Sequence, residues 1–286
     1  GVIGEKIDPY KITKKISNTN LDATEGILAA SRSIMTTDSF PKTFISTLRY
    51  KSKVFKIYGF AKGSGMISPN MGTMLAYIFI EAPINRRQLK LMLNQNLSST
   101  FNSITVDGDT STSDTVILFS SKTSNEKIIK DKKIITKISK CLHRVMLNLA
   151  KQIVSDGEGI SKLIQVHVRK AKSKKQAEKI AFSIAKSILV KTAIAGEDAN
   201  WGRVVMAIGK SDKNAVQNKI IISFGSLIVA KKGSIYKNIN IRKLHQYMKN
   251  RKININVDLG LGKFDKKVWS SDLTHDYISL NADYRS

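Results

Sequence analysis

Apolar residues recur along this chain with two periods, which predict strands alternating with amphipathic helices. Alternating or continuous apolar runs predict strands over 54–60, 76–80, 103–106, 115–119 and 163–168, and a strand-rich remainder over 219–230, 253–259 and 277–282. Spacings of three and four residues predict helices over 8–17, 21–33, 85–94, 126–154, 173–189 and 242–249. Helical segments lying between strand segments indicate an α/β (α+β) protein.

One stretch breaks this pattern between the predicted strands 54–60 and 76–80. Gly63, Gly65 and Gly72 punctuate it and permit a tight backbone with positive φ. A hydroxyl residue, Thr73, follows the last glycine at the mouth of the second strand. If the chain is cut before Thr73, the new α-amine, with a pKa near ~8, lies beside Oγ and can act as its base. The alternative is a glycine-rich turn in which Thr73 only starts the strand.

Composition places the chain among ordinary globular proteins. It has 286 residues, of which 42% are apolar, enough for a sizeable core. No apolar run approaches the ~18 residues of a membrane span, so we expect no membrane association. Cys141 is the only cysteine, which excludes an internal disulfide and favours a reducing cytoplasm.

The formal net charge of +26, from 48 Lys and Arg against 22 Asp and Glu, suggests an anionic partner. The basic residues are spread along the chain, and the densest cluster, residues 169–175, has no interleaved aromatic residues for base stacking. We therefore expect a small anionic substrate rather than nucleic acid. A basic binding protein without catalysis remains an alternative hypothesis.

Motifs for other chemistries are missing from the sequence. Asp107 and Asp109 flank Gly108, but Leu118 stands where a calcium loop of this kind needs glutamate. The histidines share no metal-ligand spacing with each other or with Cys141, so we expect no metal. Neither a Gly-x-Ser-x-Gly elbow nor a phosphate-binding or dinucleotide fingerprint is present. Thr73 is thus the best candidate nucleophile.

Six segments together resemble the ornithine acetyltransferase (glutamate N-acetyltransferase) family of arginine biosynthesis. They are residues 34–38, 62–75, 104–112, 156–159, 196–203 and 281–286. The resemblance covers essentially the whole chain and implies the family's architecture of layered sheets flanked by helices, similar to DmpA. Gly1-Val2-Ile3-Gly4 resembles the middle of the family's oxyanion-hole region, so we expect the first third of a family member to be absent here.

The resemblance implies self-cleavage between Gly72 and Thr73, giving an α chain that ends at 72 and a β chain over 73–286. Thr73 is then the nucleophile that carries the acetyl group, and Gly1 is the remaining member of the oxyanion hole. The implied substrate contacts are Thr36 (with Thr37 as the alternative), Lys62, Thr73, Glu158, Asn281 and Ser286. Two positions depart from the family pattern: Gly72 replaces an alanine, and Ser286 replaces a terminal threonine but keeps the hydroxyl.

The activity implied by the resemblance is acetyl transfer from N-acetylornithine to glutamate without a cofactor. Acetyl-CoA is a possible second donor, and the sequence leaves its use open. Two cut α/β pairs are expected to associate as a heterotetramer. A self-processing aminopeptidase or amidase of related architecture is the alternative that would share the nucleophile but release its product to water.

Overall fold

A computed structural model describes residues 6–17, 26–68, 74–110, 114–121, 127–212 and 215–283. The helices are α1 (Pro9–Ser17), α2 (Gly26–Ser33), α3 (Arg86–Leu97), α4 (Lys132–Ser155), α5 (Lys174–Ala185), α6 (Ile188–Ala195), α7 (Trp201–Ser211), α8 (Ile241–Met248) and α9 (His275–Asp283). The strands are β1 (Lys42–Tyr50), β2 (Lys53–Lys62), β3 (Leu75–Ile80), β4 (Thr115–Ser120), β5 (Leu163–Ala171), β6 (Ile221–Phe224), β7 (Leu227–Lys231), β8 (Ser234–Ile235), β9 (Lys252–Asp258) and β10 (Phe264–Ser271).

The first half of the molecule is a four-stranded sheet in the order β1-β2-β3-β4. The strands pair antiparallel except β3 and β4, which are parallel. One face carries the buried residues Ile57, Ile78 and Ile80, and α4 packs against it through the fully buried Leu142 and Leu149. The apolar stripe predicted for this long helix is therefore confirmed, although the helix begins at Lys132 rather than 126.

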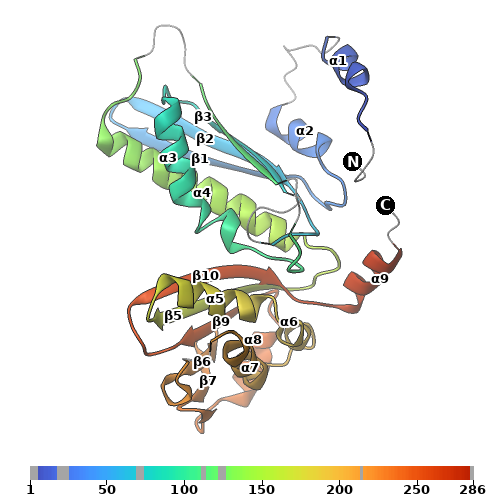
Figure 1. Ribbon diagram of the computed structural model, residues 1–286, viewed down its shortest axis with the longest axis vertical. Coiled ribbons are helices and arrows are strands. Elements are labelled where there is room, and N and C mark those ends of the chain that lie inside the picture. Colours follow the sequence, from blue (N-terminus) through green and yellow to red (C-terminus); the bar gives the residue numbers. More distant parts are fainter. Residues whose placement is uncertain are drawn as a thin grey trace.

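The second half is a six-stranded sheet in the order β10-β5-β9-β6-β7-β8. Helix α5 packs on β5 and β10, and α7 packs on α5. Ser173 caps α5 by accepting a hydrogen bond from the Gln176 N–H, as its spacing predicts. Figure 1 shows α4 lying between the two sheets, so the α/β class with layered sheets flanked by helices is confirmed.

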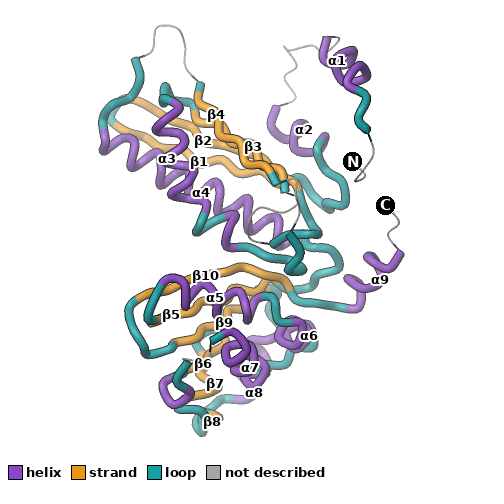
Figure 2. Tube along the Cα trace, in the orientation of Figure 1, coloured by secondary structure: helices purple, strands orange, loops and turns teal. Residues whose placement is uncertain are grey.

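Loops from both halves meet between the sheets, next to α4 and α9 (Figure 2). The Val106 N–H donates to the Ile67 carbonyl at 2.8 Å, and the Thr105 N–H donates to the Trp269 carbonyl at 2.9 Å. Lys191 of α6 is 5% exposed and donates to the Val106 carbonyl. Burial lowers the pKa of Lys191 to about 8, because a charged ammonium is costly to remove from water. These contacts hold the loop after residue 104 against both sheets.

The structure corrects several predicted elements. Residues 277–282, predicted as strand, lie in helix α9, which has no buried residue and so lacks the pattern of a core element. The segment 103–106 forms one isolated bridge, from Ile104 to Trp269, instead of a strand. The helix predicted over 173–189 ends at Ala185, and α6 begins after the new cap Ser187. Strands β1 and β10 and helix α7 had not been predicted.

Candidate functional site

The segment that leaves β2 is the centre of the site. Lys62, the last residue of β2, pairs with Leu75 of β3, so the chain departs and returns at the same edge. The Lys62 ammonium donates to the Thr36 hydroxyl at 3.4 Å. The neighbouring Thr37 hydroxyl is hydrogen-bonded to the hydroxyl of Ser64. The structure thus brings Lys62 and Thr36 together, and it places both candidate threonines against the segment 62–64.

Glu158 approaches the same segment from the end of α4. Its N–H donates to the Ser64 carbonyl at 3.3 Å. A Cβ added at Gly65 would lie 2.7 Å from one Glu158 carboxylate oxygen, so only glycine lets this carboxylate come so close. Asn281 of α9 donates to the same carboxylate at 3.1 Å. The fold therefore brings together Glu158 and Asn281, two of the predicted substrate contacts, which are 123 residues apart in sequence.

Gly159 allows α9 to reach Glu158. It adopts φ +61°, and an added Cβ would lie 2.3 Å from the Tyr277 nitrogen. The Thr274 hydroxyl also donates to the Gly159 carbonyl. The glycine after Glu158 therefore provides both the turn and the close contact that dock the C-terminal helix.

A buried ion cluster, not identified from the sequence, underlies these contacts. The Lys42 ammonium lies between the carboxylates of Asp38 and Asp156, and the Lys42 side chain is 0% exposed. Asp38 accepts the Gly63 N–H at 2.8 Å, and Asp156 accepts the Ser39 N–H at 3.0 Å. Burial acts to raise the pKa of Asp38, but the Gly63 N–H and Lys42 outweigh it, so the pKa lies below its usual value. The cluster fixes the threonine loop, the end of β2 and the Glu158 loop relative to one another.

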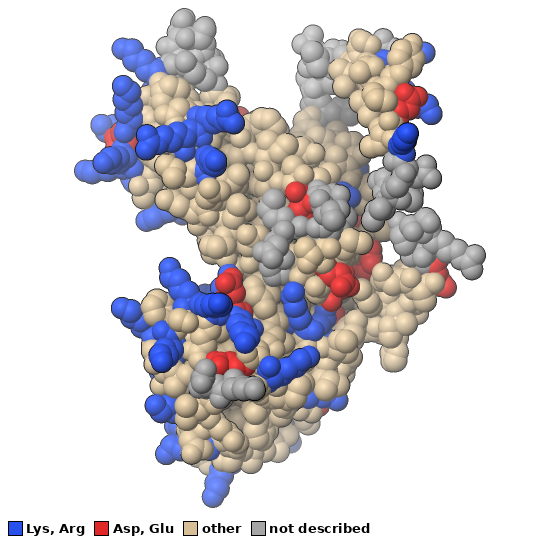
Figure 3. Space-filling model, viewed as in Figure 1, with Lys and Arg blue, Asp and Glu red and all other residues tan. Residues whose placement is uncertain are grey.

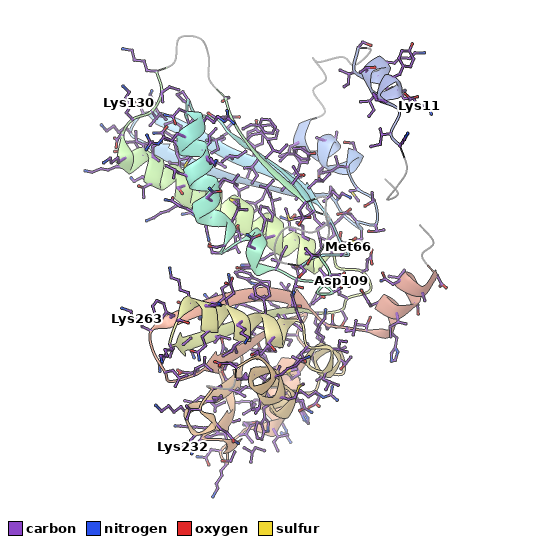
Figure 4. The ribbon with its side chains drawn as sticks, in the orientation of Figure 1. Lys11, Met66, Asp109, Lys130, Lys232 and Lys263 are labelled. Carbon is purple, nitrogen blue, oxygen red and sulfur yellow. The ribbon has the colours of Figure 1, made fainter. Side chains whose placement is uncertain are left out.

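Two other aspartates accept hydrogen bonds from backbone N–H groups after β2 and just before β3. Asp107 accepts the N–H groups of Met66 and Ile67 at 2.6 and 3.1 Å. Asp114 accepts the Met74 N–H at 2.6 Å, and burial raises its pKa to about 6. In Figure 4 the labelled residues Met66 and Asp109 mark this region between the two sheets. Asp107 and Asp114 thus act as hydrogen-bonding turn residues.

The remaining predicted site residues, Gly1, Gly72, Thr73 and Ser286, lie outside the described residues. Among the described residues, no group of three or more His, Cys, Asp or Glu side chains is arranged to hold a metal ion. No helix in the described part of the chain has the length and apolar character to cross a membrane.

The motif over 196–203 has a structural role in the described structure. Glu197 forms an ion pair with Lys162 at 3.2 Å, and Asn200 caps α7 by accepting the Arg203 N–H. The Arg203 guanidinium donates to the Leu189 carbonyl at 2.7 Å. These contacts join the segment to Lys162, to the start of α7 and to α6.

Sequence signals for the ion cluster existed but were incomplete. Asp38 and Asp156 both lie inside segments that resemble the family, next to the implied substrate contacts. Lys42 had no such signal, because a lysine among 48 basic residues reads as a solvated side chain. Lys42 becomes buried only because the fold brings it against Asp156, which is 114 positions away in the sequence.

Comparisons with known proteins agree with this arrangement. The ArgJ family matches residues 1–286. The arginine biosynthesis bifunctional protein ArgJ of Brucella suis is 44% identical over all of this chain and 71% of its own length. That of Ruegeria pomeroyi is 47% identical, over all of this chain and 69% of its own length. A crystal structure of ArgJ from Bacillus halodurans matches with a TM-score of 0.70 and 37% identity, covering 74% of this chain and 100% of that chain. The chain therefore belongs to the ArgJ family of arginine biosynthesis enzymes.

Proposed function

We propose that this acetyltransferase moves the acetyl group of N-acetylornithine to glutamate through an acetyl-threonine intermediate on Thr73. The observation that carries the proposal is the pairing of a cation and a carboxylate around one glycine-rich segment, with Lys62 beside Thr36 and Glu158 beside Gly65. Both substrates are amino acids that carry a carboxylate, and ornithine also leaves with a free amine. Lys62 can bind the carboxylate and Glu158 the ammonium, since such charge-assisted contacts are the strongest hydrogen bonds in proteins.

The first step is self-cleavage. The Thr73 hydroxyl attacks the Gly72 carbonyl carbon, the peptide C–N bond breaks, and water hydrolyses the resulting ester to leave a Gly72 carboxylate and a free Thr73 amine. A chain beginning at Thr73 would hold 214 of the 286 residues, about 75%. The solved ArgJ chain from Bacillus halodurans is matched over its whole length by 74% of this chain. This agreement in size supports cleavage at the proposed bond.

Acetyl transfer follows by a ping-pong sequence. The Thr73 amine takes the hydroxyl proton while Oγ attacks the acetyl carbonyl, and ornithine leaves with that proton on its nitrogen. Glutamate then binds in the place of ornithine; its neutral amine attacks the acetyl carbon, the bond from that carbon to Oγ breaks, and the amine proton passes through the Thr73 amine to Oγ. Gly1 would donate to the oxyanion, and losing one such donor typically costs ~10²–10³ in rate. Asn281 and Ser286 would close the substrate site from the C-terminal end.

Three further properties belong to the proposal. Acetyl-CoA serves as a second acetyl donor, in keeping with the name bifunctional that the relatives carry. Two cut pairs associate, as the family resemblance implies. The enzyme works in the cytoplasm, where the buried free thiol of Cys141 stays reduced.

The test is the intact mass of the full-length gene product beside a Thr73→Ala variant, with Thr110→Ala as an exposed threonine control. We expect two fragments that divide at Gly72–Thr73 in the wild type and in Thr110→Ala, and one uncut chain in Thr73→Ala. An uncut wild type would contradict the self-cleavage step.

The second measurement follows acetyl groups with N-acetylornithine as donor. Appearance of N-acetylglutamate in step with ornithine supports acetyl transfer. Release of acetate whether or not glutamate is present would instead indicate a hydrolase with the same nucleophile.

A further inference from the structure

A groove outside the predicted site lies between α5 and α7 and ends at the start of α6. It encloses about 510 Å³ and has three lysines, Lys179, Lys186 and Lys210, on its walls. Between the lysines the lining is largely apolar, with Phe182 and Met206 among the residues that form it. Figure 3 shows basic side chains gathered over this face of the lower half of the molecule. The groove therefore combines positive charge with an apolar wall.

Helix geometry sets the dimensions of the groove. Lys179 lies on α5 and Lys186 is the C-cap residue of that helix, so their spacing of seven positions corresponds to about 10 Å along one face. Met206 and Lys210 are four residues apart on the facing side of α7. The Ser183 hydroxyl of α5 donates to the Ala207 carbonyl of α7 at 2.7 Å and fixes the distance between the two walls.

The charges that line the groove favour an anion, while Asp107 and Asp109 lie close enough to Lys186 to offset part of its charge. No carboxylate is among its lining residues in the described structure. Glu178, the acidic residue beside Lys179, forms an ion pair with Lys266 at 2.8 Å. The N-terminus of α6, capped by Ser187, adds the positive end of a helix dipole at the inner end.

The inner end of the groove adjoins the proposed active site. The Lys186 ammonium donates to the Ser68 hydroxyl at 2.7 Å and to the Gly108 carbonyl at 3.5 Å. Ser68 is five residues before Thr73 along the chain. A long ligand lying in the groove would thus have one end beside the segment that leads to the proposed nucleophile.

We propose that this groove binds the acetyl-CoA donor as a phosphate-bearing ligand with an apolar arm, a proposal that rests on the function proposed above. Its phosphates would lie at Lys179 and Lys210, and its arm would follow Phe182 and Met206 toward Lys186. The thioester C–S bond breaks as the bond from Thr73 Oγ to the acetyl carbon forms, and the thiol leaves with the hydroxyl proton. N-acetylornithine carries no phosphate and would not need the groove.

The test compares the two acetyl donors in the cut, full-length enzyme. Variants Lys179→Glu and Lys210→Glu reverse charge in the groove, and Lys175→Glu reverses an exposed charge on the first turn of α5, outside the groove lining. We expect the KM for acetyl-CoA to rise about tenfold or more relative to the KM for N-acetylornithine in each groove variant, since one charge-assisted hydrogen bond is worth about that factor. The control should leave the ratio of the two KM values unchanged.

Binding of coenzyme A itself, measured by calorimetry at low and high salt, gives a second readout. Saturable binding that weakens in both groove variants supports the proposal. Two results would overturn it: coenzyme A binding no tighter than inorganic phosphate, or an equal rise of the KM values for acetyl-CoA and N-acetylornithine in the groove variants. Failure of the wild type to use N-acetylornithine would instead contradict the proposed function, whether or not coenzyme A binds.

Discussion

The buried Lys42 allows the sharpest prediction, because one side chain joins three parts of the site. Its ammonium contacts the carboxylates of Asp38 and Asp156, and both Lys42 and Asp38 side chains are 0% exposed. Replacing Lys42 by Met keeps the unbranched stem but leaves two buried carboxylates without a cation. Breaking a buried pair in this way typically destabilises a protein by about 3–5 kcal/mol. This is a large part of the ~5–15 kcal/mol that keeps a typical domain folded.

The pH dependence of this loss has a definite sign. In the wild type the pKa of Asp38 is lowered, so its contribution to stability is present above the unfolded pKa, about 3.9, and is lost as pH falls through the folded value. Without Lys42, the burial of Asp38 is no longer offset by a cation, so the pKa of Asp38 rises and its folded form binds a proton more readily. The difference in unfolding free energy between wild type and Lys42→Met should therefore be largest at pH 7 and shrink toward pH 4.

Urea unfolding followed by circular dichroism measures this difference. We expect the midpoint of Lys42→Met to fall by about 1–1.7 M at pH 7, which is a loss of about 3–5 kcal/mol divided by an unfolding slope of about 3 kcal/mol/M. Lys56→Met removes an exposed lysine of β2 and should change the unfolding free energy by less than about 0.5 kcal/mol.

A second variant tests the stabilising role of the ion cluster if Lys42→Met fails to fold. Lys42→Met combined with Asp38→Asn removes one of the uncompensated charges and should recover part of the lost stability. A loss for Lys42→Met below about 1 kcal/mol, or one that is the same at pH 7 and pH 4, would refute a stabilising role for the ion cluster.

Three further changes test the site around this cluster. Gly65→Ala places a Cβ 2.7 Å from the Glu158 carboxylate, so we expect the KM for N-acetylornithine to rise at least tenfold in steady-state assays while the fold is retained. Gly159→Ala meets the backbone of α9 at a positive φ and should lower the thermal midpoint and loosen α9, seen as faster amide exchange there. Asp114 has its pKa raised to about 6, so its folded form binds more protons and stability falls as pH rises from about 4 to 6. Asp114→Asn, which still accepts the Met74 N–H, should remove that fall in urea titrations at several pH values.

Helices and strands of this chain differ, for a physical reason, in how far their own residues predict them. Helix α4 follows from its own residues, because a 24-residue amphipathic stripe is a local signal. Strand β1 starts with the buried Lys42 and has exposed Ile45 and partly buried Phe44, so its polarity does not alternate as a half-buried strand should. Helix α9 was mistaken for a strand because it buries no residue of its own and is held by single contacts such as that of Asn281 to Glu158.

The sequence by itself determined the family and the order of the elements around the glycine-rich segment, and it singled out Lys62, Thr36, Glu158 and Asn281, whose side chains make contacts around that segment. These are carried by local residue types and their order. Only the tertiary structure decided that Lys42 is buried between Asp38 and Asp156, and that a basic groove on α5 and α7 opens beside Ser68. Burial and charge pairing depend on contacts across more than 100 residues, as between Lys42 and Asp156 or Ser68 and Lys186, and no local pattern records them.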